Sequence, residues 1–203
     1  MESKRTRSVW QARVISRVTN PCILSVLVLF SIAYTESSNL RAIVGWMMIL
    51  LLFLVVLPLI YTYVRIFASR SGTKPVGDPT IFLKQHPRDV LILGVLSGLP
   101  CVVILVFLEA PLLVLCTLIA LLASSLIIAS FNIFYRISYH LAALTVLAIM
   151  VTITWGQFFL ITFAAIPLIG WAKYQLLEHT PTQLVIGIVL SVAVSQITLY
   201  VLH

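Results

Sequence analysis

Charged side chains are scarce in this chain of 203 residues. Asp, Glu, Lys and Arg make up 9% of it, whereas hydrophobic residues make up 61%. A soluble domain carries about 25% charged residues, and a chain with a mean hydropathy of +1.13 cannot cover itself with polar surface. The composition therefore excludes a soluble domain and predicts an all-α, polytopic membrane helix bundle with room for six or seven transmembrane helices.

Cysteine and acidic residues are also few. Cys22, Cys101 and Cys116 fall in or beside apolar runs, so we expect small core residues and no disulfide. The six acidic residues offer too few clustered carboxylates for magnesium, and no cysteine–histidine cluster suits zinc. We therefore expect no metal and no cofactor.

A secretory signal with a recognisable cleavage site is absent, so we expect the first apolar run to stay as an anchor. Compactness and the lack of targeting signals favour a prokaryotic inner membrane. We divide the chain into a basic amphipathic segment, 1–20, and a single transmembrane helical domain, 21–203.

Seven apolar runs separate the polar parts of the chain. They cover residues 21–34, 42–64, 90–108, 112–130, 141–155, 157–171 and 182–202. The fifth and sixth runs give helices of only about 22 Å, against a hydrocarbon core of about 30 Å. These two helices must either extend into the neighbouring polar segments or draw those segments below the membrane surface. Pro58 predicts a kink in the second run.

The basic residues are distributed unequally. With seven crossings, the N-terminus and the loops 65–89, 131–140 and 172–181 share one side. Twelve of the thirteen Lys and Arg residues fall on that side, and only Arg41 falls on the other. Cytoplasmic loops are rich in Lys and Arg, so we expect this side, with the N-terminus, to face the cytoplasm.

The first 20 residues carry five basic side chains with apolar residues between them. This pattern fits a basic amphipathic helix on an anionic bilayer surface. It also fits a charged flank that only orients the first transmembrane helix. Anionic lipid headgroups, and no nucleic acid, are the partners expected for this segment.

The polar segment 171–187 (WAKYQLLEHTPTQLVIG) lies between two apolar runs and contains a helix start. Thr180 suits the N-cap, Pro181 the first helical position, and Gln183 the third position of a capping box. His179 directly precedes this helix, where free N–H groups and the helix dipole favour an anion. With Lys173 six residues upstream, the segment predicts a phosphate site.

A second polar segment, 135–140 (YRISYH), is expected on the same membrane side. His140 ends it, with Ser138 two residues earlier. Two histidines on one face suit a nucleophile and a general acid, because the histidine pKa lies near neutral. The alternative is that these polar residues only cap helices at the membrane interface.

These two segments resemble signatures of the type-2 phosphatidic acid phosphatase superfamily, membrane lipid phosphatases related to vanadium haloperoxidases. The last signature of that family is Ser-Arg, five residues, His, three residues, Asp. Here Ala172-Lys173, five residues, His179, three residues and Gln183 keep the spacing. Residues 137–140 (ISYH) resemble the middle signature, Pro-Ser-Gly-His. The similarity covers about residue 132 to the C-terminus.

The resemblance implies a phosphatase-like fold and a role for each matching residue. His179 would be the nucleophile that forms a phosphohistidine, and His140 the general acid for the leaving lipid alcohol. Gln183 would take the place of the aspartate that orients the nucleophile. The phosphate-binding side chains would be Lys173, Ser138, Lys84 and Arg88. The last two are the nearest substitutes for an absent first signature, Lys, six residues, Arg-Pro, and they fit ordinary positive-inside topology equally well.

Four signature positions differ from the family pattern: Ala172, Lys173, Tyr139 and Gln183. A lysine lacks the bidentate fork of arginine, and a glutamine brings no negative charge to the histidine. These changes favour a catalytically degenerate relative that serves as a lipid-binding or accessory subunit of a membrane complex.

The two retained histidines instead favour a membrane-embedded lipid phosphate or diphosphate phosphatase with a cytoplasm-facing site. Its substrate would be phosphatidate or a polyprenyl phosphate or diphosphate. An oligomer or a membrane-complex partner fits either function. A transporter is disfavoured because the apolar runs contain no charged residue at mid-helix and no paired broken helices.

Overall fold

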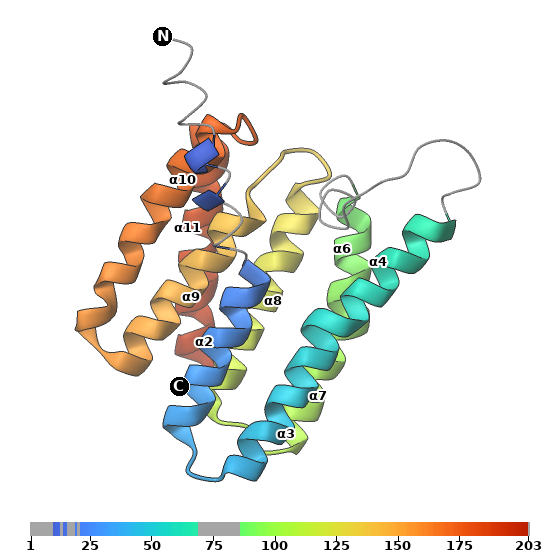
Figure 1. Cartoon of the computed structure of the whole chain (residues 1–203), viewed down its shortest axis with the longest axis vertical. Coiled ribbons are helices and arrows are strands. Elements are labelled where there is room, and N and C mark those ends of the chain that lie inside the picture. Colours follow the sequence, from blue (N-terminus) through green and yellow to red (C-terminus); the bar gives the residue numbers. More distant parts are fainter. Residues whose placement is uncertain (1–9, 13, 16–18, 20, 69–85, 203) are drawn as a thin grey trace.

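The structure is a computed structural model of the chain, and it describes residues 10–12, 14, 15, 19, 21–68 and 86–202. Within these residues the chain is helical and contains no strand. Figure 1 shows the helices running alternately up and down beside one another.

The described residues form seven helical rods. The first three are α2 (Pro21–Glu36); α3 (Leu40–Leu51) with η1 (Leu52–Val56) and α4 (Leu57–Ala68); and α6 (Pro87–Leu93) with η2 (Gly94–Gly98) and α7 (Leu99–Phe107). The last four are α8 (Leu112–Phe131), α9 (Tyr139–Trp155), η3 (Gln157–Ala164) with α10 (Ala165–Gln175), and α11 (Pro181–Leu202). Each apolar run predicted from the sequence becomes one rod.

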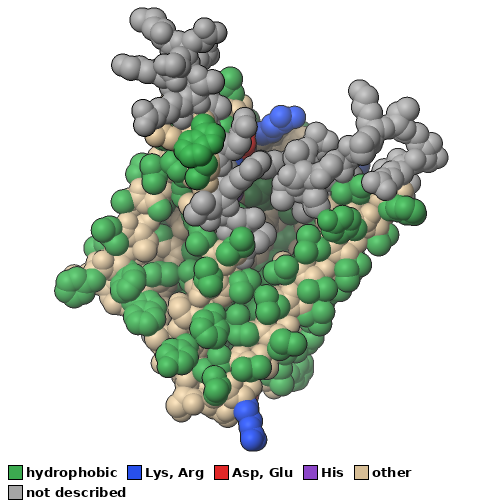
Figure 2. All heavy atoms as spheres, viewed as in Figure 1, with side chains coloured by type: hydrophobic (Ala, Val, Ile, Leu, Met, Phe, Trp, Pro, Cys, Tyr) green, Lys and Arg blue, Asp and Glu red, His purple; other side chains and the backbone are tan. Residues whose placement is uncertain are grey.

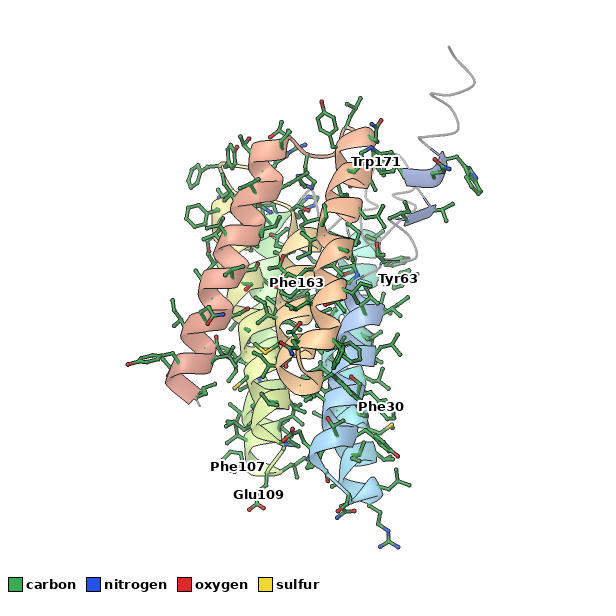
Figure 3. All side chains as sticks on the ribbon, turned by 90° about the vertical axis from the view of Figure 1, so that its left-hand side faces the viewer. Phe30, Tyr63, Phe107, Glu109, Phe163 and Trp171 are labelled. Carbon is green, nitrogen blue, oxygen red and sulfur yellow. The ribbon has the colours of Figure 1, made fainter. Side chains whose placement is uncertain are left out.

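Five of these rods are long and apolar enough to cross a membrane: Leu40–Phe67, Pro87–Phe107, Leu112–Phe131, Gln157–Gln175 and Pro181–Leu202. The other two, α2 and α9, are apolar but shorter. Hydrophobic side chains cover most of the described surface on the face of the bundle drawn in Figure 2, and Phe30, Tyr63 and Phe107 point outward in Figure 3. The chain is therefore an integral membrane protein built as an all-α bundle.

The two short apolar runs extend into the polar segments, which was one of the two outcomes expected for them. Helix α9 begins at Tyr139, and α10 continues to Gln175. The eight residues of η3 form a 3₁₀ helix, which rises about 2.0 Å per residue. The rod η3–α10 therefore reaches about 32 Å, long enough for a hydrocarbon core.

Two π-helical segments, η1 and η2, each end just before a Leu-Pro pair. Proline has no N–H, and its ring clashes with the carbonyl four residues earlier. For Pro58 and Pro100 that carbonyl lies inside η1 and η2, so the helix widens there. The disturbance predicted at Pro58 thus takes the form of a π turn. Ser97 Oγ in η2 donates to the Phe53 carbonyl in η1 at 2.8 Å and joins the two segments.

The core lies along α8 and α9. One cluster of buried side chains joins α2, α3, α7, α8 and α9, and includes Leu29, Leu50, Leu105 and Met150. A second joins α9, α10 and α11 through Leu141, Ile169 and Leu184, with Ile15 of the N-terminal segment packed against it. The described part of that segment is helical at 10–12 and 14–15. Its five basic residues lie outside the described residues.

The described basic residues divide unequally between the two ends of the bundle. Arg65, Arg88, Arg136 and Lys173 belong to the end that carries the connections α4–α6, α8–α9 and α10–α11. Arg41 lies at the opposite end, in the first turn of α3. We call the first of these the basic end; the division agrees with the predicted asymmetry.

Candidate functional site

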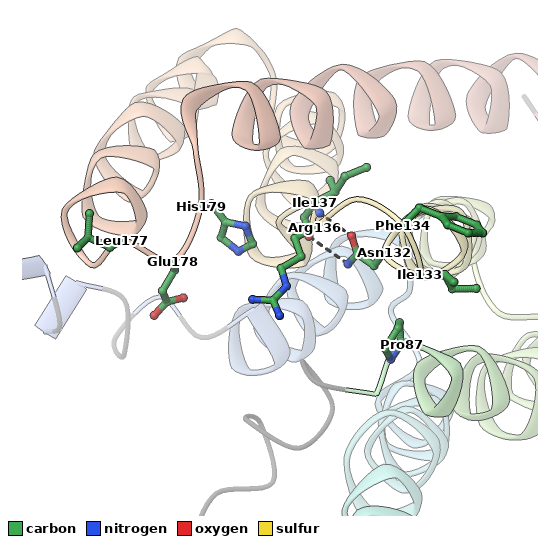
Figure 4. A pocket seen from close by; sticks show the side chains of 9 residues that line it. All are labelled: Pro87, Asn132, Ile133, Phe134, Arg136, Ile137, Leu177, Glu178 and His179. Carbon is green, nitrogen blue, oxygen red and sulfur yellow. Dashed lines mark hydrogen bonds between the residues drawn. The ribbon is translucent and has the colours of Figure 1, made fainter.

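A cavity of about 570 Å³ opens at the basic end of the bundle. We call it the polar pocket. Its walls come from the start of α6, the α8–α9 connection and the α10–α11 connection (Figure 4). The lining residues are Pro87, Asn132, Ile133, Phe134, Arg136, Ile137, Leu177, Glu178 and His179. Both polar segments of the sequence thus contribute to one pocket.

Asn132 shapes the α8–α9 wall of the polar pocket. Its Nδ2 donates to the Ile137 carbonyl at 3.1 Å, and its Oδ1 accepts from the Ile137 N–H. This pair of hydrogen bonds closes the loop that carries Arg136. The Arg136 side chain is exposed and extends into the pocket (Figure 4). The loop therefore presents a guanidinium on a fixed backbone.

Gly187 allows α11 to lie close against the same loop. A Cβ atom at this position would lie 3.3 Å from both Ile137 Cγ2 and the Ser138 carbonyl oxygen. A larger side chain would push α11 away from the pocket wall. The α8–α9 loop is thus fixed by Asn132 on one side and by α11 on the other.

The α10–α11 wall contains an ion pair between a buried lysine and a more exposed glutamate. Lys173 is 3% exposed, and its Nζ donates to Glu178 Oε2 at 3.0 Å. Leu177 has a φ of 54°, which turns the chain back so that the two side chains meet. A buried lysine needs such a partner, because an unpaired charge away from water is very unfavourable. Lys173, predicted to bind phosphate, is thus engaged by a carboxylate of the pocket wall.

His179 lines the polar pocket immediately before α11. The capping box predicted after it is confirmed: Gln183 Oε1 accepts from the Thr180 N–H at 2.9 Å, and Thr180 Oγ1 accepts from the Gln183 N–H at 3.4 Å. Gln183 therefore stabilises the helix start. Figure 4 shows the His179 ring and the Arg136 guanidinium extending into the same space, with Glu178 beside them.

The other predicted histidine does not line the polar pocket. His140 is half-buried in the first turn of α9, and its Nε2 lies 3.5 Å from Thr19 Oγ1. Ser138 is fully buried and caps α9 by accepting from the Leu141 N–H at 3.5 Å. Ser138 therefore caps a helix, which is what we expected if the polar segments only cap helices at the membrane interface.

The two residues proposed for the missing first signature are placed differently. Arg88 is exposed and adjacent to Pro87, which lines the polar pocket. Lys84 lies outside the described residues. These two positions were linked only as the nearest substitutes for the absent first signature of the resembled family.

Arg136, Asn132 and Glu178 all line the polar pocket, although no sequence pattern had predicted a site role for them. Asn132 directly follows a long apolar helix, a position where asparagine often makes local turns. An asparagine at this position predicts an ordered loop. An ordered loop holds the backbone of Arg136 in place, which makes Arg136 a candidate for binding a ligand.

A second polar cluster joins α4 to α6. Asp89 is 2% exposed, and its Oδ1 accepts from the Tyr61 hydroxyl at 2.9 Å and from Arg65 at 3.1 Å. Arg65 is half-exposed at the basic end. This cluster is a polar cross-link between the rods α3–η1–α4 and α6–η2–α7.

The polar pocket suits an anion better than a metal ion. Glu178 is paired with Lys173, so Arg136 and the N-terminal end of α11 supply positive potential. Within the ranges that the structure describes, no three His, Cys, Asp or Glu side chains gather as metal ligands would. Comparisons with protein-family models, curated proteins and solved structures find no match for this chain.

Proposed function

We propose that the protein is a membrane-embedded lipid phosphate or diphosphate phosphatase with His179 as its nucleophile. One observation carries the proposal: an imidazole, a guanidinium and a helix N-terminus meet at one polar pocket. The pocket volume of about 570 Å³ lies within the usual range of about 300–1,000 Å³ for ligand sites. It lies at one end of a membrane bundle, where a lipid head group would sit.

The chemistry needs few groups. Arg136 would bind two phosphate oxygens, because its planar fork matches them. A ring nitrogen of His179 would attack phosphorus, forming a P–N bond while the P–O bond to the lipid breaks. The leaving oxygen takes a proton, and water then cleaves the phosphohistidine to release phosphate and restore the imidazole. His140 stays the expected acid, and its position beside Thr19 makes this role a point to test.

We also propose that the polar pocket faces the cytoplasm of a prokaryotic cell, with seven crossings of the membrane. The concentration of described basic residues at the basic end supports this orientation. Phosphatidate and polyprenyl phosphates or diphosphates are the substrates that the pocket and its surroundings would suit.

A second function is favoured by two contacts. Gln183 is used in the capping box, and Glu178 is paired with Lys173. A glutamine in place of the aspartate of the resembled family brings no negative charge to that position, so His179 would be a weaker nucleophile. The alternative is a protein that binds a lipid phosphate without hydrolysing it, alone or as an accessory subunit.

Phosphate release by the purified protein separates the two functions. Phosphatidate and a polyprenyl diphosphate would be offered to the native chain and to His179→Ala, His140→Ala and Arg136→Gln. Under the first function, His179→Ala abolishes release, and Arg136→Gln lowers it about 100-fold, the usual effect of removing one preorganised donor. Arg41→Gln, at the opposite end, is the matched control and keeps full activity.

Trapping the intermediate identifies the nucleophile directly. Substrate labelled with ³²P would be mixed with the protein and quenched in alkali, where phosphohistidine survives. Label on the peptide containing His179 supports hydrolysis. Native protein that binds labelled lipid, forms no phosphohistidine and releases no phosphate would leave the binding function in its place.

A further inference from the structure

An apolar cavity of about 360 Å³ lies inside the bundle, away from the polar pocket. Its walls come from α2, the rod α3–η1–α4, the rod α6–η2–α7, α8 and α9. Representative lining residues are Ser25, Leu54, Gly94, Ser97, Leu122 and Ala143. Both π-helical segments face it, and the glycines of η2 let Leu122 and Leu126 of α8 pack closely against that segment.

Most of the cavity lining is apolar, and two of its four hydroxyls, those of Ser97 and Ser25, are bonded to the chain; the other two belong to Ser125 and Tyr139. Ser97 Oγ donates to the Phe53 carbonyl at 2.8 Å, and Ser25 Oγ donates to the Pro21 carbonyl at 2.7 Å. A polar ligand would find few partners there, and burying its polar groups unpaired would be unfavourable. The cavity therefore suits a hydrocarbon occupant.

The apolar cavity and the polar pocket share a helix face. Pro87 lines the pocket, and Val90, Gly94 and Ser97 line the cavity. Their spacing of three, seven and ten residues keeps all four on one side of the rod. The opposite wall continues in the same way, from Ile137 in the pocket to Ala143 in the cavity. A molecule with a polar head and an apolar chain would follow this face from one into the other.

The cavity also has a route to the surrounding lipid. Helices α2 and α4 line opposite sides of it, and α4 leans away from α2 in Figure 1. Only 17% of the most apolar part of Leu40–Phe67 is buried, against 44% for Leu112–Phe131. A chain in the bilayer could enter sideways here without crossing a polar layer.

We infer that the apolar cavity holds one hydrocarbon chain of the phosphate-bearing lipid whose head group occupies the polar pocket. This inference rests on the proposed head-group site. A second chain, where the lipid has one, stays in the bilayer. Because bilayer tails are as apolar as the cavity wall, the cavity selects by shape and length more than by hydrophobicity.

A photoreactive lipid tests the inference without requiring hydrolysis. The probes are phosphatidate and a polyprenyl phosphate, each with a diazirine near the middle of one chain, in vesicles containing the full-length protein. The expected result is label on the segments that line the cavity in α6–η2, α8 and α9. Label confined to outward-facing side chains would overturn the inference. The two probes show whether an acyl or a prenyl chain is preferred.

Filling the cavity gives the matched variants. Ala143→Phe and Val90→Phe place a ring in the cavity, and the same changes at Ala193 and Val189, exposed on α11, are the controls. Cavity labelling is expected to fall at least about tenfold in a filled variant and to stay unchanged in its control. Equal labelling in the filled variants would contradict the inference. Thermal unfolding in detergent shows which of the two filled variants is folded.

Phosphate release in the same samples keeps this inference apart from the proposed function. Label in the cavity without phosphate release supports the chain site and removes the phosphatase. Phosphate release from a short-chain, water-soluble phosphomonoester that persists in Ala143→Phe, while release from the long-chain lipid falls, supports both. Release from the long-chain lipid that is unaffected by both filled variants overturns the chain site alone.

Discussion

The rods around α9 and the rod α3–η1–α4 are held in different ways. Helix α9 is buried from Leu141 to Met150 except at Ala143, and apolar side chains of α8, α10 and α11 surround it. The rod α3–η1–α4 is largely exposed, and Trp46, Ser97 and Asp89 mark its polar attachments to other rods. Apolar packing holds α9 in place, whereas a few specific hydrogen bonds hold the α4 end of the rod α3–η1–α4.

The polar pocket lies beside the closely packed helices, and the apolar cavity lies beside the more exposed rod α3–η1–α4. The polar pocket takes most of its lining from connections at the ends of the closely packed helices, where the hydrogen bonds of Asn132 and the capping box of α11 order the backbone beside Arg136 and His179. The apolar cavity needs the loosely held rod, because a fully packed α4 would close it. Under the proposed function, phosphate chemistry and the entry of a lipid chain would thus depend on different parts of one bundle.

The largest effect should come from a bulky residue in the closely packed part. Gly187→Leu forces a side chain against Ile137 and Ser138, and overpacking of this kind destabilises by about 1–3 kcal/mol or more. Gly45→Leu on α3 is the matched control, since a Cβ there meets nothing within 4 Å. Thermal unfolding in detergent should show a clear loss only for Gly187→Leu. Equal losses would contradict the contrast between the two parts.

The polar attachment of α4 should give the next effect. Tyr61→Phe removes one of the two donors to Asp89 and leaves a buried carboxylate with Arg65 alone. A weakened buried acceptor costs about 1–3 kcal/mol. Tyr63→Phe, two residues further along α4 and 61% exposed, should change the unfolding temperature very little. Identical unfolding temperatures for both variants would show that the cluster does not hold the rod.

The helix start beside His179 should respond more weakly. Gln183→Ala removes the carbonyl that accepts from the Thr180 N–H, and losing such a cap costs about 1 kcal/mol. Gln183→Glu keeps the capping box and adds a negative charge at a helix N-terminus, so stability should be kept or slightly raised. If Gln183 instead orients His179, both variants would change phosphate release without changing the unfolding temperature.

Much of the fold could be predicted because it depends on local patterns. The apolar runs predicted every rod to within four residues at each end, and Thr180-Pro181-Thr182-Gln183 predicted the start of α11. The 3₁₀ helix η3 was not foreseen, because no residue in it breaks an α-helix by itself. The membrane side and the count of crossings stay predictions.

The site was predicted less completely because it depends on contacts between distant residues. The spacing of residues in the sequence predicted that His179 belongs to a polar site. It could not predict that the buried Lys173 would form an ion pair with Glu178. It also could not show that His140 would face Thr19, which is 121 residues away. Arg136 was not predicted as a site residue, because its position in the polar pocket depends on the loop that Asn132 closes.

The smallest effect should come from the contact between the two π-helical segments. Ser97→Ala removes the donor to the Phe53 carbonyl, and hydrogen bonds between membrane helices average about 0.6 kcal/mol. Ser130→Ala, whose hydroxyl donates within its own helix to Leu126 at 2.9 Å, is the matched control. Because Ser97 also lines the apolar cavity, its loss should change chain labelling more than stability. If Ser97→Ala instead lowered the free energy of unfolding by well above about 1 kcal/mol, the contact between η1 and η2 would hold the rod α3–η1–α4 firmly in place. The apolar cavity would then be closed to lipid.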